Sequence, residues 1–202
     1  MNEILPGVFH WTARHPKIGF PVSSYFLAES GTLLDPIAPE DGLDWFREHR
    51  PEWIALTNRH HDRDSKRFCD EFGIGPVLVP ETGMYEFDDK DLDVRAYQPG
   101  EEILSGIVSH EVGAICSDDT ALEIRSVGAL ALADALVHFE DGVRFVRDEY
   151  MDEPAKTKRA LATSLESLLD VDFDSLLFAH GMPIVREGKH ALREFLATNP
   201  GA

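Results

Sequence analysis

Residues 53–65, WIALTNRHHDRDS, decide how this sequence is interpreted. The first five residues, 53–57, form a short apolar run that is typical of a buried strand. Four side chains of the kinds that bind zinc and similar metals follow it: His60, His61, Asp62 and Asp64. Two cations, Arg59 and Arg63, alternate with them and would repel a bound metal ion. The stretch therefore predicts a strand that ends in a metal site, either working or degenerate.

Length and composition indicate one globular domain over residues 1–202, because a chain of this size with 43% apolar residues buries a substantial core. No apolar run approaches the roughly 18 residues that are needed to cross a bilayer. The start of the chain, MNEILPG, lacks the basic residues and apolar run of a signal peptide. We therefore expect a cytoplasmic protein that does not enter membranes, and its oligomeric state stays open.

The charge of the chain restricts its partners. It carries 37 acidic residues against 19 basic ones, for a net charge of −18. Nucleic acids and anionic membranes would be repelled by such a surface, so we expect a small-molecule substrate in their place. A strongly acidic protein is also typical of adaptation to high salt, where screening makes the repulsion between like charges tolerable.

We expect the thermal unfolding midpoint to rise from low salt to molar KCl. Screening shortens the range of repulsion between surface charges from about 30 Å at 0.01 M salt to about 3 Å at 1 M. Thermal unfolding at a series of KCl concentrations measures this effect. A midpoint that does not rise with salt would contradict adaptation to a halophilic environment.

Strands and helices are predicted in two groups along the chain. The first group has strands over 23–28, 31–35, 53–57 and 77–79, with helices over 39–49 and 64–72. The second group has strands over 103–109, 121–125, 128–133 and 175–179, with helices over 153–169 and 188–196. Two groups of strands, each accompanied by helices, predict an α/β fold of two sheets with helices on the outside.

Four of the predicted strands are followed directly by an imidazole or a carboxylate. The strand over 53–57 precedes the cluster described above, and the other three precede His110, Asp134 and His180. Ligands bind beyond the carboxyl ends of strands in open α/β sheets, so the repeated pattern indicates a functional site. Asp134 follows the apolar run ALALA, and a buried carboxylate there needs a partner, for which we expect a metal or an arginine.

The order and spacing of these residues resemble the metallo-β-lactamase superfold of hydrolases, over roughly residues 23–196. That family carries T-H-x-H-x-D-H after a strand, then G-H-x-x-G, G-D and G-H-G. Residues 57–63, TNRHHDR, match the first motif at Thr57, His60 and Asp62. The later motifs correspond to SHEVG at 109–113, ADA at 133–135 and AHG at 179–181. The resemblance implies a four-layer αββα sandwich of two mixed β-sheets with helices on the outer faces.

Two positions depart from the family's first motif. Asn58 replaces its first histidine and Arg63 its last, so each of the family's two metal sites has lost one ligand. The resemblance implies that the first site retains three ligands: His60, His110 and Asp134. The second would retain Asp62, Asp134 and His180, but a guanidinium cannot coordinate a cation. We therefore expect one zinc ion at most, or none, with manganese or iron as alternative metals.

Several residues of the first motif also have a structural interpretation. The spacing favours His60 as a ligand over a role at the start of the helix that follows. His61 is more readily interpreted as structural, and Asp64 as the N-cap of that helix. Either one replaces a predicted ligand if the local register shifts by one residue. On the surface, Asp62 would pair with Arg59 or Arg63.

Two hypotheses of function follow. In the first, the protein is a metal-dependent hydrolase of a small ester, thioester or lactam-like substrate that uses a metal-activated water. Asp62 would orient that water, and Arg63 or His180 would stabilise the oxyanion. In the second, the protein is catalytically inactive and binds a small ligand or a protein partner. A charge-paired network would then replace the metals: His60, Asp62, Arg63 and Asp134.

Overall fold

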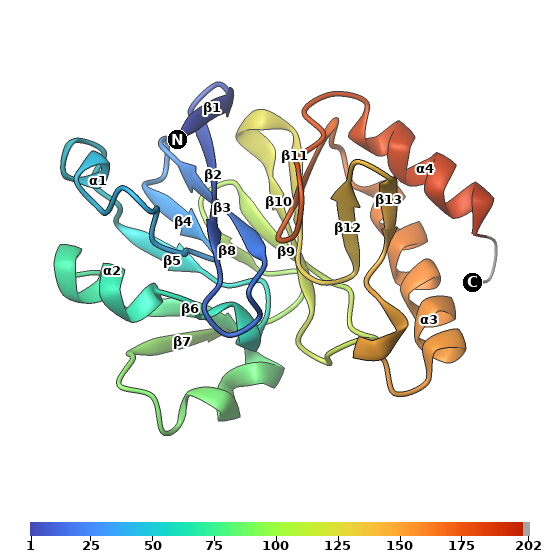
Figure 1. Cartoon of the computed structure of the whole chain (residues 1–202), viewed down its shortest axis with the longest axis horizontal. Helices are drawn as coiled ribbons and strands as arrows, with labels where there is room; N and C mark the ends of the chain where they lie inside the picture. Colours follow the sequence, from blue (N-terminus) through green and yellow to red (C-terminus); the bar gives the residue numbers. More distant parts are fainter. Residues whose placement is uncertain (200–202) are drawn as a thin grey trace. The chain divides into compact units, whose positions relative to one another are not determined.

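The computed structural model describes residues 1–199 of the chain. These residues form two compact units, the first over residues 1–98 and the second from residue 99 onward (Figure 1). Each unit holds a large mixed β-sheet and its own hydrophobic core. Two mixed sheets with helices confirm the predicted α/β class, whereas the single domain over residues 1–202 stays a prediction.

The first unit is built on a seven-stranded sheet with the order β1-β2-β3-β4-β5-β6-β7. Neighbours from β1 to β4 are antiparallel, and neighbours from β4 to β7 are parallel. The strands predicted over residues 23–28 and 31–35 are confirmed as β3 and β4, which pair in antiparallel orientation. The bounds of the strands are Asn2–Leu5, Val8–Arg14, Pro21–Leu27, Thr32–Leu34, Trp53–Ala55, Val77–Pro80 and Val94–Tyr97.

Helices α1 (Trp45–Glu48) and α2 (Ser65–Phe72) supply aromatic side chains to the core of the first unit. Phe68 and Phe72 lie one helical turn apart on α2, and both rings contact Phe46 of α1. Two 3-10 helices, η1 (Arg59–His61) and η2 (Glu81–Phe87), follow β5 and β6. The first of these, η1, thus follows the carboxyl end of β5, in the stretch of candidate ligands.

The long helix predicted over residues 39–49 is wrong, because regular helix begins only at Trp45. Gly42 has φ +86°, and its N–H donates to the carbonyl oxygen of Pro39, which closes a turn. A left-handed residue at this position is incompatible with an α-helix that continues through it. The apolar spacing of Leu43 and Phe46 therefore reflects burial of a turn and one short helix.

The second unit is built on a five-stranded sheet with the order β14-β11-β10-β9-β8. Only the neighbours β11 and β14 in this sheet are parallel. The strand predicted over residues 103–109 is instead two strands, because Gly106, at φ +75°, turns the chain between β8 and β9. A separate two-stranded sheet pairs β12 with β13. The bounds of β8 to β14 are Glu102–Leu104, Ile107–Glu111, Thr120–Ile124, Ala129–Leu132, Leu136–Phe139, Gly142–Phe145 and Ser175–Phe178.

Helices α3 (Pro154–Ser167) and α4 (Gly188–Thr198) bury apolar side chains in the core of the second unit. Leu161 and Leu165 form the buried stripe of α3, one helical turn apart, as the sequence predicts. The structure confirms the helices predicted over residues 153–169 and 188–196. Three short 3-10 helices complete the bounds: η3 (Arg125–Val127), η4 (Asp148–Tyr150) and η5 (Leu168–Asp170). Across residues 1–199, no helix is both long and apolar enough to cross a membrane.

One buried histidine of the first unit makes stability depend on pH. His10 on β2 is only 4% exposed, and its Nε2 lies 3.0 Å from the Ser23 hydroxyl. Burial, with a smaller contribution from the amino-terminal charge, lowers the pKa of His10 from 6.5 to about 4. The unfolded chain therefore binds a proton at a higher pH than the folded protein, and acid favours unfolding between these two values.

We expect His10 to remove about 3 kcal/mol of folding free energy as the pH falls from 6.5 to 4, at 1.36 kcal/mol per pKa unit. A His10→Gln variant cannot titrate at this position, so this part of the pH dependence should disappear. Urea unfolding of both proteins across this pH range measures the difference. Parallel pH profiles for the two proteins would contradict the prediction.

Candidate metal-binding residues

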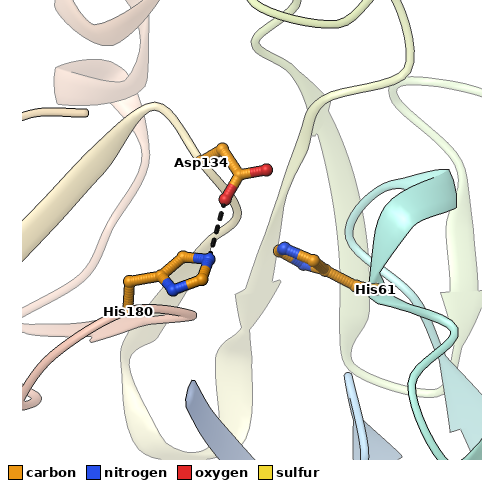
Figure 2. A group of neighbouring side chains, drawn as sticks. All are labelled: His61, Asp134 and His180. Atoms are coloured by element: carbon orange, nitrogen blue, oxygen red, sulfur yellow. Dashed lines mark ion pairs between the residues drawn. The ribbon is translucent and has the colours of Figure 1, made fainter. Parts of the chain in front are cut away.

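Asp134 and His180 lie side by side at the ends of two neighbouring parallel strands (Figure 2). The register pairs Leu132 of β11 with Phe178 of β14, and each candidate comes two residues after its strand's paired residue. His180 Nε2 lies 3.1 Å from Asp134 Oδ1, and 20% of each side chain is exposed. The structure thus brings two predicted ligands together and gives Asp134 a histidine as its partner.

The strand end that carries Asp134 is supported by a second, buried carboxylate. Asp119 Oδ1 accepts a hydrogen bond from the backbone N–H of Asp134 at 3.3 Å. The carbonyl oxygen of Asp119 accepts further hydrogen bonds from the N–H groups of Val112 and Gly113. The segment before β10 therefore fixes the backbone from which the Asp134 side chain projects.

His110 lies on β9 itself and is paired with a carboxylate of the same sheet. Its Nε2 lies 3.1 Å from Oε2 of Glu123 on β10, whose other oxygen lies 3.3 Å from Nε of Arg125. Only 10% of the Glu123 side chain is exposed, so this ion pair is partly shielded from water. A metal on His110 Nε2 would have to displace Glu123, and the predicted ligand role of His110 stays a prediction.

In the first unit, His61 rather than His60 is the buried histidine. It lies on η1 after β5, and its Nδ1 is 2.9 Å from Oδ2 of Asp35. The Thr57 hydroxyl donates to the same Asp35 oxygen at 2.6 Å, and the Thr57 N–H donates to Asp35 Oδ1 at 2.8 Å. Metal-binding histidines commonly donate their second ring nitrogen to a carboxylate in this way, which leaves Nε2 as the coordinating atom.

The charge of Asp35 is stabilised although the carboxylate is buried. Burial alone would raise the pKa of Asp35. The His61 ring and the Arg63 guanidinium outweigh burial and hold the pKa of Asp35 below its ordinary value. A charged Asp35 in turn fixes the proton of His61 on Nδ1, because a carboxylate accepts and does not donate.

His60 and Asn58 have other positions in the structure. His60 is exposed, and its backbone N–H donates to Oδ1 of Asn58 at 2.9 Å. The Asn58 side chain is buried and caps η1, so its amide oxygen is used in the fold. The predicted ligand role of His60 stays a prediction. Its backbone, which Asn58 caps, leads into His61, whose ring contacts Asp35.

The carboxylates Asp62 and Asp64 both make contacts that the sequence does not reveal. Asp62 forms an ion pair with Lys90 at 2.7 Å, a partner that the sequence does not indicate. Asp64 stands at the N-cap position of α2, but its side chain makes no capping hydrogen bond. Its Oδ2 accepts instead from the N–H of Ala38 at 2.7 Å.

Arg63 is a structural connection between strands in the first unit. Its backbone has φ +39°, and its Nη1 donates to the carbonyl oxygens of Ser23 at 2.6 Å and Asp35 at 2.7 Å. The predicted catalytic roles of Asp62 and Arg63 stay predictions.

Asp35 and Lys90 are the functional candidates that the motif comparison misses. Asp35 follows β4 directly, so the strand-end signal that identifies Asp134 applies to it equally. The partner of Asp62 has no such signal, because Lys90 lies in an acidic loop 28 residues later. Neither contact can be derived from spacing within the motif.

Comparison with known proteins identifies the fold. No protein-family model and no curated protein sequence matches the chain. Among solved structures, a metallo-β-lactamase family protein from Thermus thermophilus has a TM-score of 0.70 and 17% identity, over 98% of this chain and 80% of that one. A metallo-β-lactamase from Erythrobacter litoralis has a TM-score of 0.67 and 12% identity, over 98% and 95% of the chains. The protein TTHA1623, in a di-iron-bound form, has a TM-score of 0.61 and 20% identity, over 90% and 91%.

These likenesses extend over nearly the whole chain, at identities too low to transfer an activity. They agree with the two mixed sheets of the chain. The chain therefore has the metallo-β-lactamase fold, as its motif order predicts.

Proposed function

We propose that the chain is a metal-dependent hydrolase of a small-molecule substrate, with Asp134 and His180 as two ligands of one metal ion. The observation that carries the proposal is the 3.1 Å approach of His180 Nε2 to Asp134 Oδ1 beyond β11 and β14. Both side chains are partly exposed, so an ion from solvent can reach them. An imidazole and a carboxylate are donors that zinc and iron both accept.

Within the first unit, we assign a metal-ligand role to His61 in place of the predicted His60. The support is the hydrogen bond of His61 Nδ1 to the buried Asp35, the arrangement that orients ligating histidines in metal sites. His60 lies exposed and has no such carboxylate partner in the structure's described contacts. Figure 2 draws the three side chains that the proposal names.

The residues around these ligands prepare them for binding. Asp35 keeps His61 in the tautomer that presents Nε2, and the Thr57 hydroxyl holds Asp35 in place. Asp119 fixes the backbone of Asp134, whose negative charge offsets that of a cation. When bound, zinc or a similar metal supplies a water of lowered pKa that attacks a carbonyl carbon near neutral pH. A small ester, thioester or lactam is the substrate class that we propose.

A second candidate function rests on the first unit. The lost ligand positions Asn58 and Arg63 are occupied by side chains with structural roles, one capping η1 and the other binding backbone carbonyl oxygens. The Asp35, Thr57 and His61 side chains are hydrogen-bonded to one another. These contacts favour a catalytically inactive protein of the same fold that binds a small ligand.

Hydrolysis assays distinguish the two functions. The protein is reconstituted with zinc, manganese or iron and assayed with a nitrophenyl ester, an acyl thioester and a chromogenic β-lactam. The hydrolase proposal expects turnover of at least one substrate that Asp134→Asn abolishes. Asp141→Asn removes the same charge from an exposed turn of the second unit and should leave turnover unchanged. Turnover that is equal in the wild type and Asp134→Asn would contradict the proposal.

A further inference from the structure

We infer that His138 is a positioning residue that holds His180 in place for metal binding, an inference that rests on the proposed function. His138 lies on β12, outside the five-stranded sheet, and no sequence motif includes it. It nevertheless contacts the three-residue turn of His180, Gly181 and Met182 at every residue.

The backbone of His138 makes two of these contacts. Its N–H donates to the carbonyl oxygen of His180 at 3.2 Å, and its carbonyl oxygen accepts from the N–H of Met182 at 2.8 Å. Together they form a single parallel bridge between residue 138 and Gly181. This bridge joins the turn to β12. The chain after the turn is joined to β14 by an antiparallel bridge between Ile184 and Leu176.

Gly181 makes this close approach possible. Its φ is +96°, a conformation that side chains with a Cβ rarely adopt. A Cβ at this position would lie 1.8 Å from the carbonyl oxygen of His138, well inside contact distance. The turn after β14 therefore packs directly against the backbone of residue 138. We expect the position of the turn to depend on the residue at 138.

The His138 ring adds a third contact, which is specific to its chemistry. Its Nδ1 lies 2.7 Å from the carbonyl oxygen of Met182, and because a carbonyl only accepts, Nδ1 is the donor. The ring also packs near Phe178 of β14, at a centroid distance of 5.5 Å. His138 thus ties the residue after Gly181 to the strand that leads into His180, and so limits the orientations open to the His180 ring.

Metal titration of two variants tests the inference. In His138→Leu the ring hydrogen bond is lost while both backbone contacts can remain, and we expect Co²⁺ affinity to fall about 10-fold, the lower end for an outer-shell partner. In His138→Asn the side-chain amide can donate near the position of Nδ1, so affinity should stay within about 3-fold of the wild type. The control is His190→Leu, which removes a histidine that is 63% exposed on α4. It should leave Co²⁺ binding unchanged.

The ring ¹⁵N resonances of His180 in metal-free protein provide a second readout. We expect them to shift in His138→Leu, and to stay near the wild-type positions in His138→Asn and His190→Leu. A wild type that binds no Co²⁺ would defeat the proposed metal function, and the resonances would still test the positioning of His180. Unchanged resonances and affinity in His138→Leu would overturn the inference. An equal loss in His138→Leu and His138→Asn would overturn it as well.

Discussion

Replacing Asp134 with asparagine is expected to weaken metal binding by at least about 100-fold, the upper end of the loss caused by outer-shell partners alone. Asp134 follows β11 and supplies the negative charge next to His180 Nε2, at 3.1 Å. An asparagine keeps nearly the same shape, but its neutral amide is a weak metal ligand. The fold should therefore survive while the affinity is lost.

Titration with Co²⁺ in competition with a chelator measures this loss. Asp141→Asn is the matched control, because Asp141 is an exposed residue of the same unit that pairs only with Arg144 in the described contacts. The control should bind metal as the wild type does. An Asp134→Asn protein whose affinity lies within a few-fold of the wild type would remove Asp134 from the proposed metal ligands.

Replacing Asp35 with alanine is expected to lower the free energy of unfolding by about 3–5 kcal/mol, because each buried donor left without an acceptor costs about 1–3 kcal/mol. The Asp35 carboxylate is 5% exposed and lies 2.9 Å from His61 Nδ1. It also accepts hydrogen bonds from the Thr57 hydroxyl and N–H. Alanine would leave all three donors buried without this acceptor.

Urea unfolding measures the effect, with Asp70→Ala as the control. Asp70 is an exposed carboxylate of α2 that pairs with Lys66, and surface pairs contribute about 0–1 kcal/mol. The loss of unfolding free energy in Asp35→Asn should lie between those of Asp35→Ala and Asp70→Ala, because an amide oxygen can still accept from the Thr57 N–H. A loss below about 1 kcal/mol in Asp35→Ala would show that the Asp35 network contributes little to stability.

The fold and the close approach of Asp134 to His180 can be predicted from the sequence for a simple reason. The runs before Asp134 and His180 are almost wholly apolar, which is typical of strands buried on both faces. Carboxyl ends of parallel neighbours lie at the same edge of a sheet, so polar residues directly after such runs come together. The same reasoning applies to Asp35 at the end of β4.

The contacts of the first motif cannot be predicted in this way, because they depend on partners distant in the sequence. Local spacing favours His60 as the ligand, but Asn58 caps a 3-10 turn that leaves His60 exposed and buries His61. The partner of His61 lies 26 residues earlier, directly after β4. The backbone of Arg63 is in the left-handed region, and its side chain reaches back to β3.

Positive-φ glycines account for the errors in secondary structure. Gly42 and Gly106 lie within apolar patterns that periodicity alone assigns to one helix and one strand. Each instead adopts a left-handed conformation that turns the chain. Apolar spacing reports burial, and it does not distinguish a continuous element from two pieces joined by a tight turn.

Elemental analysis of protein purified without added metal tests the central claim most directly. The proposed function predicts about one equivalent of a transition metal per chain, as in sites that keep a position open for water. That metal should be lost in Asp134→Asn and His180→Asn and retained in Asp141→Asn. A protein that is metal-free as purified, and that takes up no added zinc, manganese or iron, would contradict the proposed hydrolase and favour the metal-free ligand-binding protein.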